Sequence, residues 1–280
     1  MNRHFGWLQG FLPVMIAAGV VTACQTVQTT QGGAVGIERR QMMMVSSKEM
    51  EQASSQSYHQ IIQQAGQKNA LNRDKDQVER VRAVARRLIP ATGAFRPDAP
   101  AWQWEVNVLT SNDLNAWCMA GGKIVFYSGI IEKLSLTDNE IAAIMGHEIA
   151  HALREHARER ASQSMVTNVG VAVVRAVLGV GRAGTDLIGT VAKVSFELPN
   201  SREHETEADR IGVELAALGG YDPRAAISLW QKMAKASSGA PPQWLSTHPS
   251  NETRQQDLQQ YAARVMPLYE QATQRARPVK

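Results

Sequence analysis

Cysteine is scarce in this chain of 280 residues: there are two, Cys24 and Cys118. Cys118 has no cysteine or histidine at the spacing of a metal site, so we do not expect it to bind a metal. Its neighbours Ala116, Trp117 and Met119 are apolar, which predicts a buried and unreactive thiol. If Cys24, at the end of an apolar N-terminal region, is modified, no intramolecular disulfide is possible.

Long apolar runs and dense positive charge are also missing. After the N-terminal region, the most apolar stretch is 165–180; it contains Asn168, Arg175 and several glycines, which favours a core or groove-covering helix over a membrane span. The formal net charge is only +4, and the Lys and Arg residues are scattered. This distribution gives no reason to expect nucleic acid as a partner. The chain has no internal repeats, and its length suits one domain with a full core.

What the sequence does contain is the pentapeptide His147-Glu148-Ile149-Ala150-His151. In a helix, residues i and i+4 lie on one face, one turn apart, so both imidazoles can reach one zinc ion. Glu148 lies beside them, where it can take a proton from a metal-bound water. The pattern therefore predicts a zinc site of the hydrolytic kind.

The surrounding residues favour the required helix. Thr137 and Glu140 form a capping box, which predicts where the helix starts. Gly146 has no side chain, so another element can approach closely at that point. Apolar residues recur at helical spacing and predict packing into a core: Ile141, Ile144, Met145, Ile149 and Leu153. We expect the helix to continue into 154–160 as a solvated, charged extension.

A catalytic zinc site needs a third protein ligand and an open fourth position. The segment 201–209, as a helix, places Glu205 and Asp209 one turn apart on one face. Glu205 is the candidate third ligand, and Asp209 can accept the free ring N–H of a ligating histidine and orient it. Taken alone, the segment favours a solvated acidic helix face; beside the upstream motif, it favours a ligand. Spacing leaves three competitors open: Glu203, His204 and Glu207.

These paired motifs resemble the M48 family of zinc metallopeptidases, both its periplasmic lipoprotein branch and its mitochondrial Oma1-like branch. Further stretches are similar to the family: 115–129, 247–250 followed by Arg254, and 35–41. The resemblance runs from about residue 74 to about residue 265. It implies a gluzincin-type site with one zinc ion, Glu148 as general base, and three ligands: His147, His151 and Glu205.

His248 stands before a proline in the segment 247–250. In some periplasmic members of the family the matching histidine can approach the zinc and displace the water. The resemblance also allows it to steady the oxyanion during turnover. Both roles, inhibitory ligand and catalytic helper, stay open. We expect the remaining histidines outside the motif to lie on the surface: His4, His59, His156 and His204.

The N-terminal region predicts export and lipidation. Residues 1–23 combine a weakly positive start with an apolar run too short to span a bilayer, which is typical of a signal peptide. The run ends in Val21-Thr22-Ala23-Cys24, which resembles a bacterial lipobox and makes Cys24 the lipidated residue; an ordinary signal peptide with an incidental cysteine is the alternative. Gln25 is not the aspartate that retains lipoproteins in the inner membrane. We therefore expect an outer-membrane lipoprotein of a Gram-negative bacterium, facing the periplasm and attached through its N-terminal lipid.

We expect a lipid anchor and flexible tether over 24–46 and one domain over 47–275. Within the tether, the three methionines at 42–44 predict docking against the domain's own surface. Helices are predicted over 47–65 and 74–88, the second ended by Pro90, and strands over 102–109, 115–119 and 123–127. The last two strands form a hairpin. The predicted fold class is α+β: a mainly helical gluzincin-type metalloprotease domain with a small antiparallel β-sheet beside the zinc helix.

The predicted function is zinc-dependent hydrolysis of peptide bonds in unfolded or misassembled envelope proteins. An edge strand of the small sheet would pair with an extended substrate and present its scissile carbonyl to the metal. One alternative is an assembly factor or chaperone, working with the outer-membrane assembly machinery, in which proteolysis is rare or self-inhibited. Another is a structural lipoprotein whose zinc only stabilises the fold, which requires four permanent protein ligands.

Overall fold

The computed structural model describes residues 25–177, 187–236, 243–249 and 253–275. The predicted signal peptide and Cys24 lie outside these residues. The elements follow in chain order: β1 (Gln25–Val27), β2 (Gln41–Met43), α2 (Ser47–Gln67), α3 (Lys75–Ala91), η1 (Thr92–Ala94), η2 (Ala99–Ala101), β3 (Glu105–Leu109), β4 (Ala116–Met119), β5 (Lys123–Tyr127), α4 (Ser128–Lys133), α5 (Asp138–Leu153), α6 (His156–Val177), α7 (Leu187–Phe196), α8 (Arg202–Leu218), α9 (Ala225–Ala236), α10 (Gln243–Thr247) and α11 (Arg254–Arg275). The prediction of a mainly helical α+β fold is confirmed.

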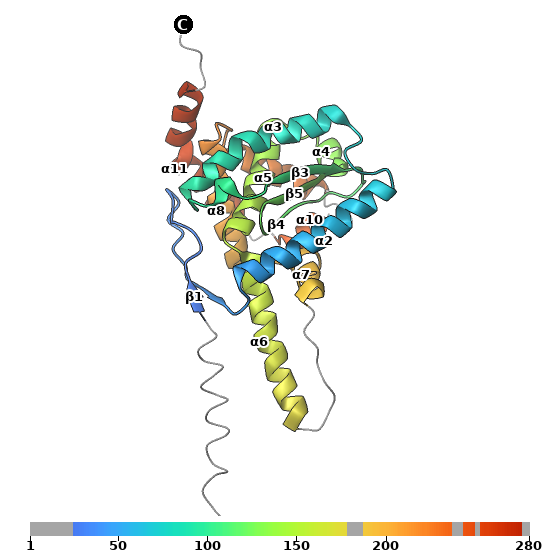
Figure 1. Cartoon of the computed structure of the whole chain (residues 1–280). Helices are drawn as coiled ribbons and strands as arrows, with labels where there is room; N and C mark the ends of the chain where they lie inside the picture. Colours follow the sequence, from blue (N-terminus) through green and yellow to red (C-terminus); the bar gives the residue numbers. More distant parts are fainter. Residues whose placement is uncertain (1–24, 178–186, 237–242, 250–252, 276–280) are drawn as a thin grey trace, which may run out of the picture.

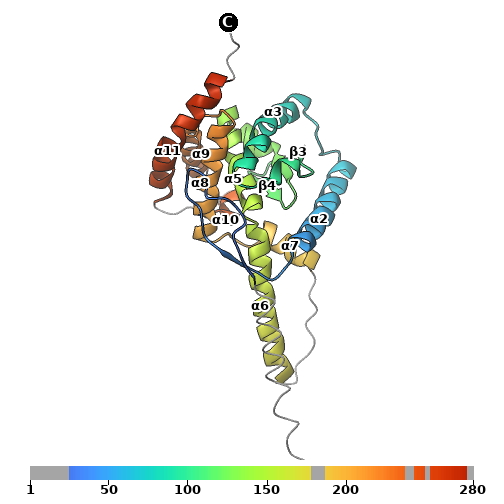
Figure 2. The ribbon, with the colours of Figure 1, turned by 60° about the vertical axis from the view of Figure 1, so that its left-hand side comes forward.

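Helix α5 is the centre of the molecule. The capping box of Thr137 and Glu140 is present, with Thr137 accepting from the Glu140 backbone N–H. From Glu140 to Leu153 the helix is buried all round, because it lies between the sheet and the layer of α8, α9 and α11 (Figure 2). Its apolar residues belong to the largest hydrophobic core of the described residues. A helix buried on every side holds its polar side chains in place, which matters for the residues it carries.

The three-stranded sheet has the strand order β3-β5-β4. The predicted hairpin is confirmed: β4 and β5 are antiparallel, and Gly121 and Gly122 form their turn with positive φ of 78° and 83°. The sheet as a whole is mixed, not antiparallel as predicted, because β3 and β5 are parallel. After β3, the chain crosses to the outer edge to form β4, so β5 returns between them in the direction of β3. Strand β4 is left as an edge, and α3 covers the sheet beside β3 (Figure 1).

The chain breaks sharply between α5 and α6, where one continuous helix was expected. Glu155 adopts a positive φ of 52°, and α6 starts at His156. The prediction that 154–160 is solvated is wrong: Arg154 and His156 have exposed fractions of 0%, and Glu159 is also buried. The break turns these polar side chains inward, where α8 and residues before α2 cover them. The spacing of apolar residues in the sequence does not predict such a break.

Residues 29–45, which we call the N-terminal segment, lie across α8 and the beginning of α6 (Figure 2). Val35 and Ile37 are part of the main core, and the backbone N–H groups of Ala34 and Val35 donate to Glu214 of α8 at 2.9 and 3.0 Å. This packing differs from the flexible tether predicted for 24–46. The predicted docking of the methionines is confirmed at Met43, which has an exposed fraction of 2%. Buried apolar side chains spaced among polar ones are what hold the segment down.

The remaining elements follow the sequence patterns closely. Helices α2 and α3 are present, although α3 runs through Pro90 to Ala91 and then tightens into η1. Pro90 stands in the last turn of α3, so the ring interrupts only one hydrogen bond before the helix ends. Among the described residues, no helix has the length and hydrophobicity needed to cross a membrane.

Candidate metal centre

Helix α5 carries the side chains of His147, Glu148 and His151 in the interior of the protein. One helical turn brings the Nε2 atoms of His147 and His151 to 3.1 Å from each other. All three side chains are almost inaccessible, with exposed fractions of 4%, 3% and 8% for His147, Glu148 and His151. The predicted convergence of the two imidazoles is therefore present in the structure.

Helix α8 brings Glu205 to the same point. The hydroxyl of Ser201 accepts from the His204 backbone N–H and starts the helix as predicted. Glu205 Oε1 lies 3.3 Å from His151 Nε2, and Glu205 Oε2 lies 3.5 Å from His147 Nε2. The competitors that spacing left open are elsewhere: the Glu203 side chain is 63% exposed, while His204 and Glu207 face residues of α6.

Helices α5 and α8 approach closely because two glycines face each other. A Cβ at Gly146 would lie 2.7 Å from the Gly212 carbonyl oxygen, and a Cβ at Gly212 would lie 2.8 Å from the His147 backbone nitrogen. Neither position tolerates a side chain without moving the helices apart. The close approach expected at Gly146 is confirmed, and it brings the carboxylate of α8 within reach of the imidazoles of α5.

The C-terminal half adds a fourth donor atom. His248, just after α10, places Nδ1 at 3.2 Å from His147 Nε2 and 2.9 Å from Glu205 Oε1. Its exposed fraction is 6%. The ligand atoms of His147, His151, Glu205 and His248 all lie within 4.8 Å of one another. The structure places His248 beside the predicted zinc ligands, as both of its predicted roles require.

The donor set fits a tetrahedral divalent metal. Four ligands at about 2.05 Å from a zinc-like ion lie about 3.3 Å apart. With Glu205 measured at Oε1 toward His151 and His248 and at Oε2 toward His147, five of the separations run from 2.9 Å to 3.5 Å, and all four donor atoms lie within 4.8 Å of one another. Three imidazole nitrogens and one carboxylate oxygen are ligands that zinc prefers.

Proton positions support the same conclusion. His147 Nδ1 lies 3.0 Å from Asp209 Oδ1, which only accepts, so Nδ1 carries the proton and Nε2 keeps its lone pair. Burial lowers the pKa of His156 and keeps it neutral, and its Nε2 lies 3.0 Å from Glu207, which only accepts, so its Nδ1 accepts from His151 Nδ1 at 2.8 Å. His151 Nε2 therefore also keeps its lone pair. Two lone pairs then face each other at 3.1 Å beside the carboxylate of Glu205, which is repulsive unless a cation lies between them.

Neighbouring charges in the site shift the pKa values of His147 and Glu205. Burial by itself lowers the pKa of His147, but the charge of Glu205 and the hydrogen bond to Asp209 outweigh burial and raise that pKa to about 9. Burial raises the pKa of Glu205, yet the neighbouring histidines hold it well below its ordinary range. In the metal-free site a proton on His147 therefore takes the place of the cation, and a metal must displace it.

Asp209 takes the outer position that its spacing predicts. It accepts from His147 as described, and Arg254 Nη2 donates to Asp209 Oδ1 at 2.7 Å. The same Arg254 Nη2 lies 3.0 Å from Glu205 Oε2, so one guanidinium connects the two carboxylates. Arg254 is itself stacked over the Trp230 ring at 3.6 Å from the ring centre. Ligand orientation thus depends on a rigid surrounding shell.

Trp244 is a site residue that sequence reasoning missed. Its indole Nε1 donates to Glu148 Oε1 at 2.7 Å, and its ring stacks on His248 with the ring centres 4.8 Å apart. His248 Nε2 also lies 3.5 Å from Glu148 Oε1. Helix α10 therefore contacts both the carboxylate beside the metal site and the fourth donor. No motif marks Trp244, because its role arises only when α10 folds back onto α5.

A cleft of about 820 Å³ opens onto these residues. Its walls include Glu148, His151 and His248 on one side and the edge strand β4 on the other. Cys118 lies in the β4 wall and is partly buried, not fully buried as predicted. Burial still raises the pKa of its thiol well above the ordinary range, which fits an unreactive thiol. A cleft of this size beside an unpaired strand edge can hold an extended peptide segment.

A sequence model of peptidase family M48 matches residues 75–262, which span the sheet, α5, α8 and the beginning of α11. The chain belongs to peptidase family M48. The M48 match covers the helices that carry His147, Glu148, His151 and Glu205, together with His248. The resemblance seen in the sequence is confirmed.

Three relatives illustrate the range of the family. The chain is 38% identical to the mitochondrial metalloendopeptidase OMA1 of Arabidopsis thaliana over 56% of this chain and 31% of the relative. It is 34% identical to the mitochondrial metalloendopeptidase OMA1 of Bos taurus over 72% of this chain and 41% of the relative. It is 26% identical to the metalloprotease LoiP of Escherichia coli over 90% of this chain and 95% of the relative. The chain spans less than half the length of the two mitochondrial relatives.

These comparisons contradict the predicted location. The sequence predicts an outer-membrane lipoprotein facing the periplasm, but the plant and bovine M48 relatives are mitochondrial proteins by name. Cys24 and the predicted signal peptide lie outside the described residues, so the structure adds no support. The outer-membrane assignment is therefore not retained.

Two histidines expected on the surface are buried. His156 has an exposed fraction of 0% and His204 one of 3%, and their rings stack with centres 4.2 Å apart. His59 is exposed as predicted, and His4 lies outside the described residues. His156 follows His151 by five residues, a spacing that in an unbroken helix would not direct the two rings at each other. The break at Glu155 is what brings them together.

Proposed function

We propose that this chain is a zinc-dependent endopeptidase, with His147, His151 and Glu205 as the zinc ligands. The observation that carries the proposal is the convergence of their donor atoms, from two helices 54 residues apart in sequence, beside the uncoordinated carboxylate of Glu148. Membership of a peptidase family supports it. So do the metalloendopeptidase names of the relatives.

When bound, zinc would polarise the scissile carbonyl and make a water nucleophilic near neutral pH. Glu148 is the base that accepts the proton of that water and then delivers it to the leaving amine. The indole N–H of Trp244 orients the Glu148 carboxylate through Oε1. Asp209 and Arg254 keep the His147 ring and the Glu205 carboxylate in the orientation that binding needs.

Substrates are proposed to be unfolded or misassembled proteins, bound as extended segments along β4. Backbone hydrogen bonds to a strand edge tolerate many sequences, and only an unfolded segment is free to form them. The edge position of β4 and the cleft between β4 and Glu148 support this orientation.

The test is hydrolysis of an unfolded protein such as reduced casein by the full chain. We expect Glu148→Gln to keep its zinc and its fold but lose activity by roughly 100-fold to 10,000-fold, since it removes the base alone. His147→Ala should lose the zinc itself. The matched control is Glu270→Gln, the same change at an exposed residue of α11 outside the cleft. Undiminished hydrolysis by Glu148→Gln, or a full zinc content in His147→Ala, would show the assignment to be wrong.

A further inference from the structure

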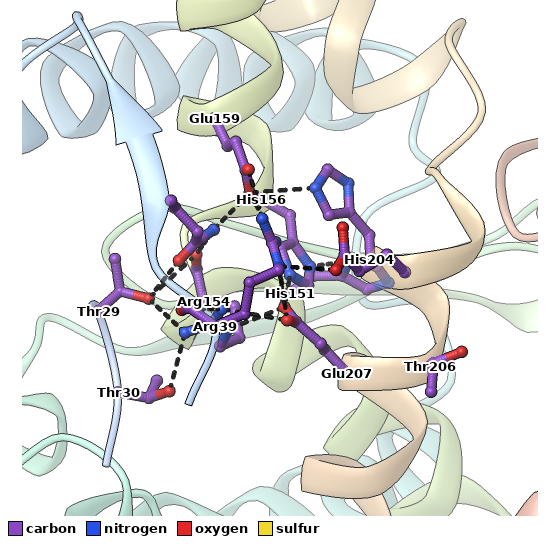
Figure 3. A network of polar contacts seen from close by, with 12 residues as sticks. Thr29, Thr30, Arg39, His151, Arg154, His156, Glu159, His204, Thr206 and Glu207 are labelled. Carbon is purple, nitrogen blue, oxygen red and sulfur yellow. Dashed lines mark hydrogen bonds and ion pairs between the residues drawn. The ribbon is translucent and has the colours of Figure 1, made fainter. Parts of the chain in front are cut away.

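A buried polar network lies beside His151, at the Nδ1 atom of its ring. We call it the His156 network, and Figure 3 shows it at the junction of the N-terminal segment, α6 and α8. It connects one proposed zinc ligand to residues more than 100 positions earlier in the chain. Its charged and imidazole members are Arg39, Arg154, His156, Glu159, His204 and Glu207.

The first link joins two imidazoles. His151 Nδ1 lies 2.8 Å from His156 Nδ1, so one of the two nitrogens carries the proton and the other accepts it. A metal on His151 Nε2 requires the proton on His151 Nδ1. His156 must then accept at Nδ1 and carry its own proton on Nε2, which lies 3.0 Å from the Glu207 carboxylate, a group that only accepts. The hydrogen bonds therefore run in one direction: His151 donates to His156, and His156 donates to Glu207.

The second link holds Glu207 in place. Arg154 donates to both of its oxygens, at 2.9 and 3.2 Å, and Arg39 does the same at 2.7 and 3.2 Å. Arg154 is fully buried, and Glu207 has an exposed fraction of 4%. A carboxylate gripped by two guanidiniums cannot turn away from His156 without leaving buried charges unpaired.

The third link ties the network to the N-terminal segment. Arg39 also pairs with Glu159 at 2.7 and 2.9 Å, and Gln41 donates to Glu159 at 2.6 Å. His204 lies 3.1 Å from Glu159 and stacks on the His156 ring. Two arginines and two glutamates balance one another, so the network is electrically neutral only while Arg39 is docked.

We propose that His156 is a positioning residue for the metal site, with Arg39 as its outer support, so that metal binding and docking of the N-terminal segment stabilise each other. The inference rests on the proposed zinc site. Its physical basis is that the orientation of a ligating imidazole depends on the acceptor at its other nitrogen. Coupling between two binding events is reciprocal. The free energy by which bound zinc stabilises the docked N-terminal segment therefore equals the free energy by which the docked segment stabilises zinc binding.

The first experiment compares His156→Asn with His156→Leu, two side chains of similar shape. The Asn Oδ1 takes the place of the accepting nitrogen, whereas Leu offers no acceptor. We expect zinc affinity, measured by competition with a chromogenic chelator, to fall about 10-fold to 100-fold in His156→Leu and to be largely restored in His156→Asn. The absorption spectrum of the cobalt-substituted protein should change in the same order. Equal affinities and spectra in both variants would overturn the proposal.

The second experiment is independent of whether His156→Leu folds. Arg39→Met removes the outer support, and Arg40→Met makes the same change at the exposed neighbouring residue. We expect Arg39→Met to weaken zinc binding by roughly 3-fold to 10-fold and Arg40→Met to leave it unchanged. In the unaltered chain, zinc should slow amide hydrogen exchange across residues 29–45. Identical affinities in the two variants, or exchange that zinc does not change, would contradict the coupling. A wild-type chain that binds no zinc would instead refute the proposed function.

Discussion

His248 gives the metal site one donor more than hydrolysis needs. Its Nδ1 lies among the ligand atoms, where the substrate carbonyl and the attacking water must otherwise come close. Stacking on Trp244 and the contact with Glu205 hold it there. We predict from this arrangement that the resting site is closed and that α10 moves before a substrate binds. This favours the inhibitory role over the catalytic one, and we treat it as a prediction.

Replacing this residue tests the closed state. His248→Ala should raise hydrolysis of an unfolded protein by about tenfold, the factor expected if the imidazole contributes roughly 1.4 kcal/mol to closure. The matched control is Ser246→Ala, an exposed position on α10 two residues before His248. Both rates are measured at saturating zinc. A rate below wild type in His248→Ala would point instead to a catalytic helper.

The low pKa of Glu159 makes the stability of the fold depend on pH. Burial raises its pKa, but hydrogen bonds from Arg39, His204 and Gln41 outweigh burial and hold the pKa well below the ordinary value of 4.5. A carboxyl with a depressed folded pKa contributes stability that is complete above its unfolded pKa and is lost as the pH falls below it.

We therefore expect the metal-free chain to lose unfolding free energy between pH 6 and pH 3, with Glu159 contributing to the loss below about pH 4.5. Glu159→Gln should be less stable than wild type at pH 6, and the difference should shrink toward pH 3. Urea unfolding at both pH values measures this. A difference that stays constant with pH would exclude Glu159 as a source of the acid sensitivity.

At the scale of elements, the site depends on how closely α5 and α8 pack. Their facing glycines remove the side chains that would separate them, and the backbone contact is next to His147. Capping motifs at Thr137 and Ser201 set where each helix starts, and so which residues face the partner. The register of two helices, and not any single ligand, brings three donor atoms to one point.

Gly212→Ala should disturb that register. The added Cβ would lie 2.8 Å from the His147 backbone nitrogen, so the helices must separate. We expect a loss of about 1–3 kcal/mol in unfolding free energy and weaker zinc binding. Gly66→Ala, where a Cβ meets nothing within 4 Å at an exposed helical position, should be neutral or slightly stabilising. Urea titration and chelator competition measure both, and unchanged zinc affinity in Gly212→Ala would contradict the argument.

At the scale of the whole molecule, the proposed zinc ion joins three parts of the chain. Helices α5 and α8 supply the ligands, α10 closes the site from the C-terminal side, and the N-terminal segment supports it from behind. In the metal-free state a proton on His147 stands in for the divalent ion, so the ligands of α5 and α8 are no longer joined through one centre. Zinc should therefore stabilise the fold as a unit.

Removing the metal should lower the thermal unfolding midpoint. With free zinc at 100 times its dissociation constant, binding adds about 2.7 kcal/mol. For a chain of this size we expect a difference of roughly 5–10 °C between the zinc-loaded and chelator-treated protein. His147→Ala should show no difference between the two conditions. An equal midpoint with and without zinc in the wild-type chain would contradict a metal that links these parts.

Sequence alone predicted the local parts of this protein. The pentapeptide with its capping box, the Glu205 helix with its serine cap, the hairpin and the mainly helical class all depend on neighbours within a few residues, and the structure has each of them. Local signals of this kind are strong because helix and turn chemistry is short-ranged. Spacing left three competitors of Glu205 open, the family resemblance implied Glu205, and the structure places its carboxylate beside both imidazoles.

Tertiary structure decided what local patterns could not. The burial of 154–160, the packing of the N-terminal segment, and the contacts of Trp244 and His156 arise where distant segments meet, and a helix break without glycine or proline gives no local signal. Charged residues in a sequence are typical of solvated surfaces, yet here Arg154, Glu159 and Glu207 are buried because each finds a partner of opposite charge on another element. A single sequence does not show which charged residues pair across long sequence distances. For this physical reason, only the tertiary structure revealed the residues that support the metal site from outside.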